Sequence, residues 1–164
     1  MSQLDYSIDQ AVGFEGQLAD LMLKNVESHV AEGEILIGKV VTQGTALGQV
    51  VHPDAAGKIT DLKLVKGVAI HSHTQESKYP AGSGNYSYLD KASIPVLTKG
   101  KVWVKAEDVI TAATSTVNCR YAGVGSKGAL RGAAVALETA VLPNAKWKTS
   151  TTAINQLAQL EIDL

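Results

Sequence analysis

Hydrophobic segments along the chain are short, and glycine, proline or asparagine interrupts them roughly every eight to twelve residues. The segments are rich in Val, Ile and Thr, which favour extended strands. Residues 34–41 are apolar on both faces, which predicts a core strand. At the C-terminus Leu160, Ile162 and Leu164 alternate with polar residues, which predicts a half-buried strand. The pattern predicts an all-β, single-domain protein, either a β-sandwich of jelly-roll-like type or a barrel, with at most short helical segments.

The remaining expected strands lie between the other turn signals. They cover residues 49–52, 59–65 and 67–73. Residues 94–105 are predicted to form a hairpin that turns at Lys99 and Gly100, with Val102 and Val104 on one face of its second arm. Residues 74–91 are polar and rich in turn residues, which predicts an exposed loop.

Two stretches do not fit the strand pattern. In residues 18–30 apolar side chains recur at helical spacing, which indicates a short helix. Residues 131–142 are rich in alanine and are compatible with a helix, a strand or a packed loop. No linker separates two apolar blocks, so we expect an extended N-terminal arm over residues 1–15 and one β-rich domain over residues 16–164. The arm carries the apolar residues Leu4, Tyr6, Ile8, Val12 and Phe14.

The amino-acid composition and net charge limit the classes of molecule that this protein is expected to bind. The 164 residues include 45% hydrophobic and 19% charged residues, with a net charge of -1. This balance argues against nucleic acid as a partner, and no apolar run reaches the ~20 residues of a membrane span. The N-terminus has no signal-peptide pattern, so we expect a soluble protein that stays in the compartment of its synthesis. A single cysteine, Cys119, excludes an internal disulfide framework.

Candidate catalytic motifs are weak. Residues 123–128 match G-x-G-x-x-G, but too little sequence follows for a dinucleotide-binding fold, so we interpret them as a glycine-rich loop. His71 and His73 would lie on one face of a strand, yet a third metal ligand is not evident. Cys119 is expected to be a small buried hydrophobe, with Arg120 on the opposite strand face. We therefore expect no enzyme, no cofactor and no metal.

Both tryptophans lie between lysines, and this placement allows two interpretations. Trp103 lies two residues from both Lys101 and Lys105, and Trp147 is flanked by Lys146 and Lys148. Each indole either caps the core beneath lysine stems or contributes to an interface, where tryptophan is enriched. The N-terminal arm also allows two interpretations: it either closes the sheet of its own fold or becomes ordered on a neighbouring subunit.

The order of several short motifs from about residue 16 to the C-terminus resembles the structural cement, or capsid decoration, proteins of tailed phages. The motif with the highest specificity is residues 94–104, IPVLTKGKVWV. The other motifs are GQLAD at 16–20, VES at 26–28, AEGEI at 31–35, IGKVV at 37–41, GVAI at 67–70, YPAG at 79–82 with Tyr88, VNCRY at 117–121, GALR at 128–131, AKW at 145–147 and LEIDL at 160–164. Residues 21–23 and 131–142 depart from the family pattern.

The resemblance implies a virion protein without catalytic residues that is made in the host cytoplasm. It further implies a dimer or trimer on the outer capsid surface, over junctions between major capsid protein subunits. We expect the capsid or oligomer contacts to include Tyr6, Phe14, Gln17, Leu18, Asp20, Trp103 and Trp147. Two other functions remain open: a phage tail or fibre component, and a small metal-dependent β-barrel enzyme that uses His71 and His73.

Overall fold

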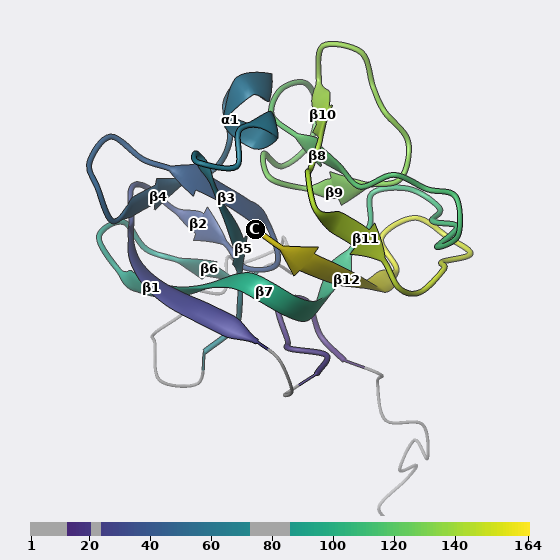
Figure 1. Cartoon of the computed structure of the whole chain (residues 1–164), viewed down its shortest axis with the longest axis horizontal. Coiled ribbons are helices and arrows are strands. Elements are labelled where there is room, and N and C mark those ends of the chain that lie inside the picture. The colour runs from purple at the N-terminus through teal and green to yellow at the C-terminus, as the bar shows by residue number, and fades with distance from the viewer. Residues whose placement is uncertain (1–12, 21–23, 73–85) are drawn as a thin grey trace, which may run out of the picture.

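Strands make up nearly all of the regular secondary structure in residues 13–20, 24–72 and 86–164, which the computed structural model describes (Figure 1). The all-β prediction is therefore confirmed. The elements are β1 (Asn25–Ala31), β2 (Ile35–Leu36), β3 (Val40–Gln43), β4 (Gln49–Val51), α1 (Ala56–Thr60), β5 (Val65–Ala69), β6 (Ser87–Tyr88), β7 (Ser93–Lys105), β8 (Asn118–Arg120), β9 (Leu130–Arg131), β10 (Thr139–Val141), β11 (Ala145–Trp147) and β12 (Leu157–Asp163).

The largest sheet closes on itself. Its strands follow the order β1-β4-β3-β5-β7, and β7 also pairs with β1, which completes a barrel. Strands β12 and β11 extend this sheet beyond β7. A three-stranded sheet of β10, β8 and β9 and a two-stranded sheet of β2 and β6 complete the described part of the fold.

Strand β7 belongs to both the barrel and its extension. Lys99 pairs with Asn25 of β1 on one edge and with Asp163 of β12 on the other. Leu97 likewise lies between β1 and β5. The predicted hairpin at Lys99–Gly100 is therefore wrong, because residues 93–105 form one continuous strand. Strands from elsewhere in the chain occupy both edges of β7, so its two halves do not pair with each other.

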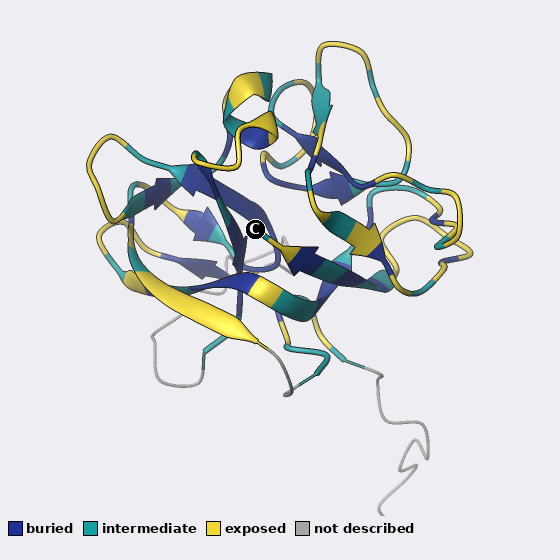
Figure 2. Ribbon diagram, in the orientation of Figure 1, coloured by how far each residue is buried: buried dark blue, intermediate teal, exposed yellow. Residues whose placement is uncertain are grey.

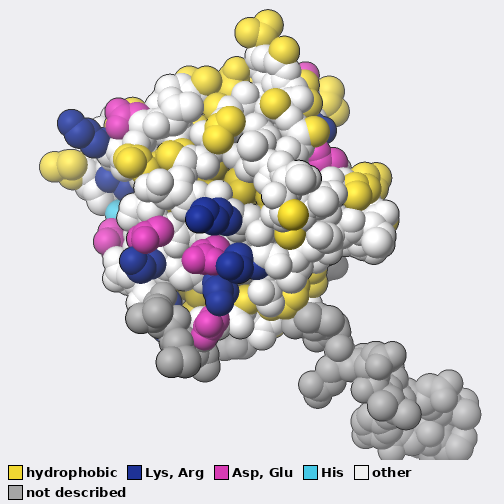
Figure 3. Space-filling view, turned by 45° about the vertical axis from the view of Figure 1, so that its right-hand side comes forward, with side chains coloured by type: hydrophobic (Ala, Val, Ile, Leu, Met, Phe, Trp, Pro, Cys, Tyr) yellow, Lys and Arg dark blue, Asp and Glu magenta, His cyan; other side chains and the backbone are white. Residues whose placement is uncertain are grey.

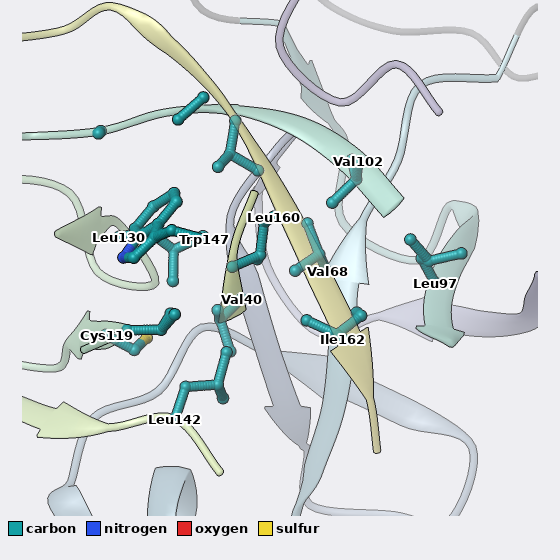
Figure 4. Packing of buried hydrophobic residues seen from close by; sticks show 14 of the residues in the cluster. Val40, Val68, Leu97, Val102, Cys119, Leu130, Leu142, Trp147, Leu160 and Ile162 are labelled. Atoms are coloured by element: carbon teal, nitrogen blue, oxygen red, sulfur yellow. The ribbon is translucent and has the colours of Figure 1, made fainter. Parts of the chain in front are cut away.

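Two clusters of buried side chains lie on opposite faces of the barrel strands. Val41, Ala69 and Val96 point into the barrel, where they meet Ile35 and Tyr88. Their neighbours Val40, Val68 and Leu97 point outward into a larger cluster under β12, β11 and the three-stranded sheet (Figure 4). Figure 2 shows the resulting buried centre. Both faces of these strands are thus apolar because both face a core.

The core and C-terminal strands agree well with the pattern. Most of residues 34–41 are buried, as predicted, but they form two strands, β2 and β3, separated by a turn at residues 37–39. Strand β4 confirms the expected strand at residues 49–52. Ala158, Leu160 and Ile162 of β12 are buried while the residues between them are not, which confirms the predicted alternation.

Two local predictions are wrong, and a third, the exposed loop at residues 74–91, is wrong at β6, while residues 74–85 lie outside the described residues. The expected strand at residues 59–65 is instead the end of α1 and a turn, and β5 begins at Val65. The expected helix over residues 18–30 is contradicted by β1. Val26 and Val30 are four residues apart, a spacing that one face of a strand satisfies as well as a helix does. Within the predicted loop at residues 74–91, β6 is buried, and the hydroxyl of Tyr88 donates to the backbone oxygen of Ile70 at 2.8 Å.

The alanine-rich stretch at residues 131–142 is mainly an exposed loop between β9 and β10, with Leu137 87% exposed, and not a packed one. The carboxylate of Asp108 accepts hydrogen bonds from the backbone N–H groups of Gly132 at 2.7 Å and Ala133 at 2.9 Å. No helix in the described part of the chain is long and apolar enough to cross a membrane. The boundary after residue 15 stays a prediction.

Candidate interaction surface at the N-terminal segment

Residues 13–20, here called the arm root, run along the C-terminal half of β7. The backbone N–H of Gly16 donates to the oxygen of Trp103 at 2.7 Å, and the N–H of Trp103 donates to the oxygen of Gln17 at 2.8 Å. Leu18 forms a β-bridge with Val102, whose other neighbour is Leu160 of β12. The arm root therefore continues the edge of β7 that β1 occupies.

This pairing brings together five of the residues expected at an interface: Phe14, Gln17, Leu18, Asp20 and Trp103. Leu18 packs against the larger core, and Asp20 lies 3.5 Å from the ammonium group of Lys101. Tyr6 lies outside the described residues.

The indole of Trp103 is covered by the chain itself. Trp103 lies on the strand face opposite the core residues Val102 and Val104, where alternation predicts exposure, yet it is only 9% exposed. Gly13 lies directly against the ring, because a Cβ at that position would be 2.8 Å from Cδ1 of Trp103. The arm root thus supplies the cover, and Trp103 supports this surface from beneath.

Trp147 is a core residue. Its side chain belongs to the larger cluster, it is 3% exposed, and its indole N–H donates to the backbone oxygen of Thr116 at 3.1 Å. The hydrogen bond satisfies the one polar group of the ring. We therefore leave Trp147 out of the candidate surface.

A buried ion pair anchors the arm root to the barrel. The carboxylate of Glu15 lies 2.7 Å from the ammonium group of Lys39 and 3.8 Å from that of Lys105. The side chains of Glu15 and Lys39 are 10% and 8% exposed. Gly38 leaves room for Glu15, whose Cγ would clash with any Cβ at position 38. No sequence motif indicates this pair, because its members are distant in the chain and come together only in the fold.

Aromatic rings gather beside the anchor. The rings of Phe14 and His71 meet edge to face with centroids 5.1 Å apart, and His71 meets Tyr86 in the same way at 6.1 Å. Phe14 is 40% and Tyr86 is 44% exposed. A hollow of about 220 Å³ next to them is lined by Gly13, Phe14, Glu15, Ile37, Tyr86, Lys105 and Leu157. We call Phe14, His71 and Tyr86 the aromatic cluster.

The described candidates for metal binding or catalysis, His71 and Cys119, lie in packed surroundings and not in a reactive site. His71 is part of the aromatic cluster, while His73 lies outside the described residues. Among the residues that are described, no three His, Cys, Asp or Glu side chains are grouped to hold a metal. Cys119 is fully buried, as expected, and burial raises the pKa of its thiol.

Arg120 braces the three-stranded sheet, a role the sequence did not indicate. Its guanidinium lies 2.9 Å from the carboxylate of Glu107, also pairs with Glu138, and donates to the oxygen of Ala122 at 3.2 Å. The hydrogen bonds that Arg120 donates to Glu107 raise the pKa of the guanidinium. The glycine-rich loop at residues 123–128 connects β8 to β9 and carries no nucleotide-binding fold around it.

The outer face of β7 and β12 is a mixed charge ladder. Lys101 is paired in register with Glu161, and Lys99 with Asp163, whose carboxylate lies 3.0 Å from the Lys99 ammonium group. Glu161 also lies 3.0 Å from Lys148, which lowers the pKa of its carboxyl. Figure 3 shows basic and acidic side chains side by side on this side of the molecule. Because the two signs alternate, this face of the described residues is neither strongly basic nor strongly acidic.

The family model described as structural cement protein (E217 gp24/Pam3 gp6) matches residues 2–163. The chain belongs to the structural cement protein family. The predicted resemblance is thereby confirmed, and this cement protein is a structural protein associated with a phage capsid.

A solved structure described as "The capsid of Myoviridae Phage XM1" contains a chain of similar fold. The two chains are 14% identical with a TM-score of 0.68, and the match covers 99% of this cement protein and 97% of that chain. No curated protein sequence matches.

Proposed function

We propose that this cement protein binds the outer surface of the capsid as a homo-oligomer and stabilises junctions between major capsid protein subunits. Membership of the structural cement family is the observation that carries the proposal. A protein that binds the closed junction but not the opened one adds its binding free energy to every opening event. Many copies on one shell multiply this effect without tight binding of each copy.

The arm root and the aromatic cluster form the capsid contact in this proposal. Phe14 and Tyr86 expose ring surface next to a hollow, and aromatic side chains in such places supply much of the binding energy of protein interfaces. The Glu15–Lys39 anchor holds Phe14 in position, so the surface is ordered before it binds. The net charge of -1 allows copies to crowd on a shell with little mutual repulsion.

Reconstitution on heads that lack the protein tests the proposal. We expect the wild type to bind the heads and to raise the temperature at which they release DNA. Phe14→Ser should lower head occupancy, whereas Leu62→Ser, at a residue of comparable exposure next to α1 at the opposite end of the molecule, should bind as the wild type does (Figure 1). Failure of the wild type to bind heads would overturn the function, and full occupancy by Phe14→Ser would overturn the contact.

Removal of the arm tests its contribution. The truncation should end at residue 12, because Gly13 covers Trp103 and Glu15 pairs with Lys39. A protein that lacks residues 1–12 keeps the anchor, and we expect it to occupy fewer head sites at equal concentration. Unchanged occupancy would remove the arm from the proposal.

A further inference from the structure

One edge of β1 is open for most of its length. Strand β1 pairs with β7 from Asn25 to Val30, but on its other edge it pairs with β4 only at Val30 and Ala31. No other strand in the described part of the chain pairs with it. Figure 2 shows β1 as an exposed strand, and its first four residues are all exposed. An unpaired edge of this kind is a template for a further strand.

The hydrogen bonds at the end of β1 identify which backbone groups are free. The N–H of Ala31 donates to the backbone oxygen of Ala92, the residue before β7. The N–H of Val30 donates to the backbone oxygen of Gly48, the residue before β4. Successive residues of a strand face opposite edges, so Val26 and Ser28 face the same way as Val30. Pro95, which has no N–H, is paired with Ser28 and agrees with this assignment. The N–H and C=O groups of Val26 and Ser28 therefore point outward at the open edge, away from β7.

The face of β1 that carries Val26, Ser28 and Val30 has uncharged side chains, while the exposed Glu27 lies on the other face. Val26 and Val30 are 38% and 41% exposed and lie on the same strand face as Ser28. A second strand that presents apolar side chains on that face would cover both valines while its backbone meets the free groups of Val26 and Ser28.

Residues 4–8 of the chain have the matching pattern. Leu4, Tyr6 and Ile8 alternate with Asp5 and Ser7, which is the period of a strand with one apolar face. These residues lie outside the described part of the structure, so the match is one of sequence. Five such residues suffice to span the open part of β1.

The arm of the same molecule starts at the wrong end of β7 to reach this edge. The arm root is antiparallel to β7, with Gly16 beside Trp103, so its N-terminal end lies beside the C-terminal half of β7. The open edge lies instead beside residues 95–97 of β7, about 25 Å back along the strand at ~3.3 Å per residue. A neighbouring molecule does not have this constraint.

We propose that residues 4–8 of a second copy add to the open edge of β1 as an extra strand and so join the subunits of the oligomer. This inference rests on the homo-oligomer of the proposed function and names the segment and the edge that form it.

Substitution at the open edge tests the pairing in solution, without capsids. Ser28→Pro removes one free N–H but no hydrogen bond to β7. We expect the wild type to sediment as an oligomer, and both Ser28→Pro and the protein without residues 1–12 to sediment as monomers with unchanged far-ultraviolet circular dichroism. Ser28→Thr, the matched control, should remain oligomeric. A monomeric wild type, or an oligomeric Ser28→Pro, would overturn the proposal.

A disulfide test separates exchange between copies from pairing within one chain. Cys119 is fully buried, so it should not compete with introduced thiols. Separately purified Ser7→Cys and Ser28→Cys proteins, mixed and oxidised, should form a crosslinked heterodimer, whereas Ser7→Cys mixed with Ala153→Cys should not. A crosslink only when both cysteines are in one chain would overturn the proposal.

Head binding distinguishes this inference from the proposed function. If Ser28→Pro keeps the wild-type mass but loses head binding, the β1 edge contacts the capsid and the exchange of arms is wrong, although the function stands. If the wild type oligomerises through the arm but does not bind heads, the function is wrong and the exchange stands.

Discussion

Gly128 shows how a single residue connects the glycine-rich loop to the barrel. Its φ is +79°, and a Cβ there would lie 2.5 Å from the backbone oxygen of Val40 and 2.9 Å from Nδ1 of His52. We expect Gly128→Ala to lower the free energy of unfolding by about 2 kcal/mol or more, through backbone strain and the displaced neighbours. Urea denaturation measures the change. Gly57→Ala, in α1 with open space around it, should be neutral or slightly stabilising.

The Glu15–Lys39 pair is the second feature that single residues decide. Glu15→Ala leaves the ammonium group of Lys39 buried without its closest partner, and loss of one member of such a pair typically costs about 3–5 kcal/mol. The double variant Glu15→Ala/Lys39→Met removes the unpaired charge and should recover much of the loss. Thermal melting of the wild type and both variants measures this. Equal stability of the single and double variants would show that the buried charge is not the cause.

At the scale of elements, His52 joins three strands of the barrel. It follows β4, its Nε2 accepts a hydrogen bond from the N–H of Leu36 in β2 at 2.9 Å, and its Nδ1 lies 3.2 Å from the oxygen of Val40 in β3. Both contacts fit the neutral ring with its proton on Nδ1. Burial lowers the pKa of His52, and Lys39 and Lys127 act in the same direction, against Val40 and Glu34.

The lowered pKa predicts a loss of stability in mild acid. The unfolded chain takes up a proton at His52 near its ordinary value of 6.5, while the folded chain resists it. The free energy of unfolding should therefore be highest above that value and fall as the pH drops below it, by at most about 1.4 kcal/mol per pH unit. Urea denaturation between about pH 7 and pH 5 measures this slope. His52→Gln should flatten it, and an unchanged slope would contradict the assignment.

At the scale of the whole molecule, the two buried clusters are built from the barrel and the sheets around it. Among the described residues, the buried members of both clusters all lie between Ala31 and Ile162. We expect the protein without residues 1–12 to unfold in one transition at a melting temperature close to that of the wild type when both are monomeric. Removal of residues 1–15 should lower it clearly, because Glu15 is lost and Trp103 is uncovered. Calorimetry at low protein concentration compares the two truncations, and similar melting temperatures would contradict the anchor.

The local hydrophobic pattern was sufficient to predict a strand where each face of that strand has the same surroundings along its whole length. The alternation that ends in Ile162 predicted β12, and apolar residues on both faces of 34–41 predicted core. The pattern failed where distant segments decide: Lys99–Gly100 carries a turn signal but continues β7, because β1 and β12 occupy its edges. Val26 and Val30 fit a helix or a strand equally, and pairing with β7 selects the strand.

The sequence by itself determined the all-β class, the family and five residues of the candidate surface that the fold brings together, since alternation and motif order are local properties. Only the tertiary structure decided that Trp103 is covered by the arm root while Trp147 belongs to the core. It alone revealed the Glu15–Lys39 anchor and the open edge of β1. These features depend on contacts between residues far apart in the chain, and such contacts leave no periodic signal in the sequence.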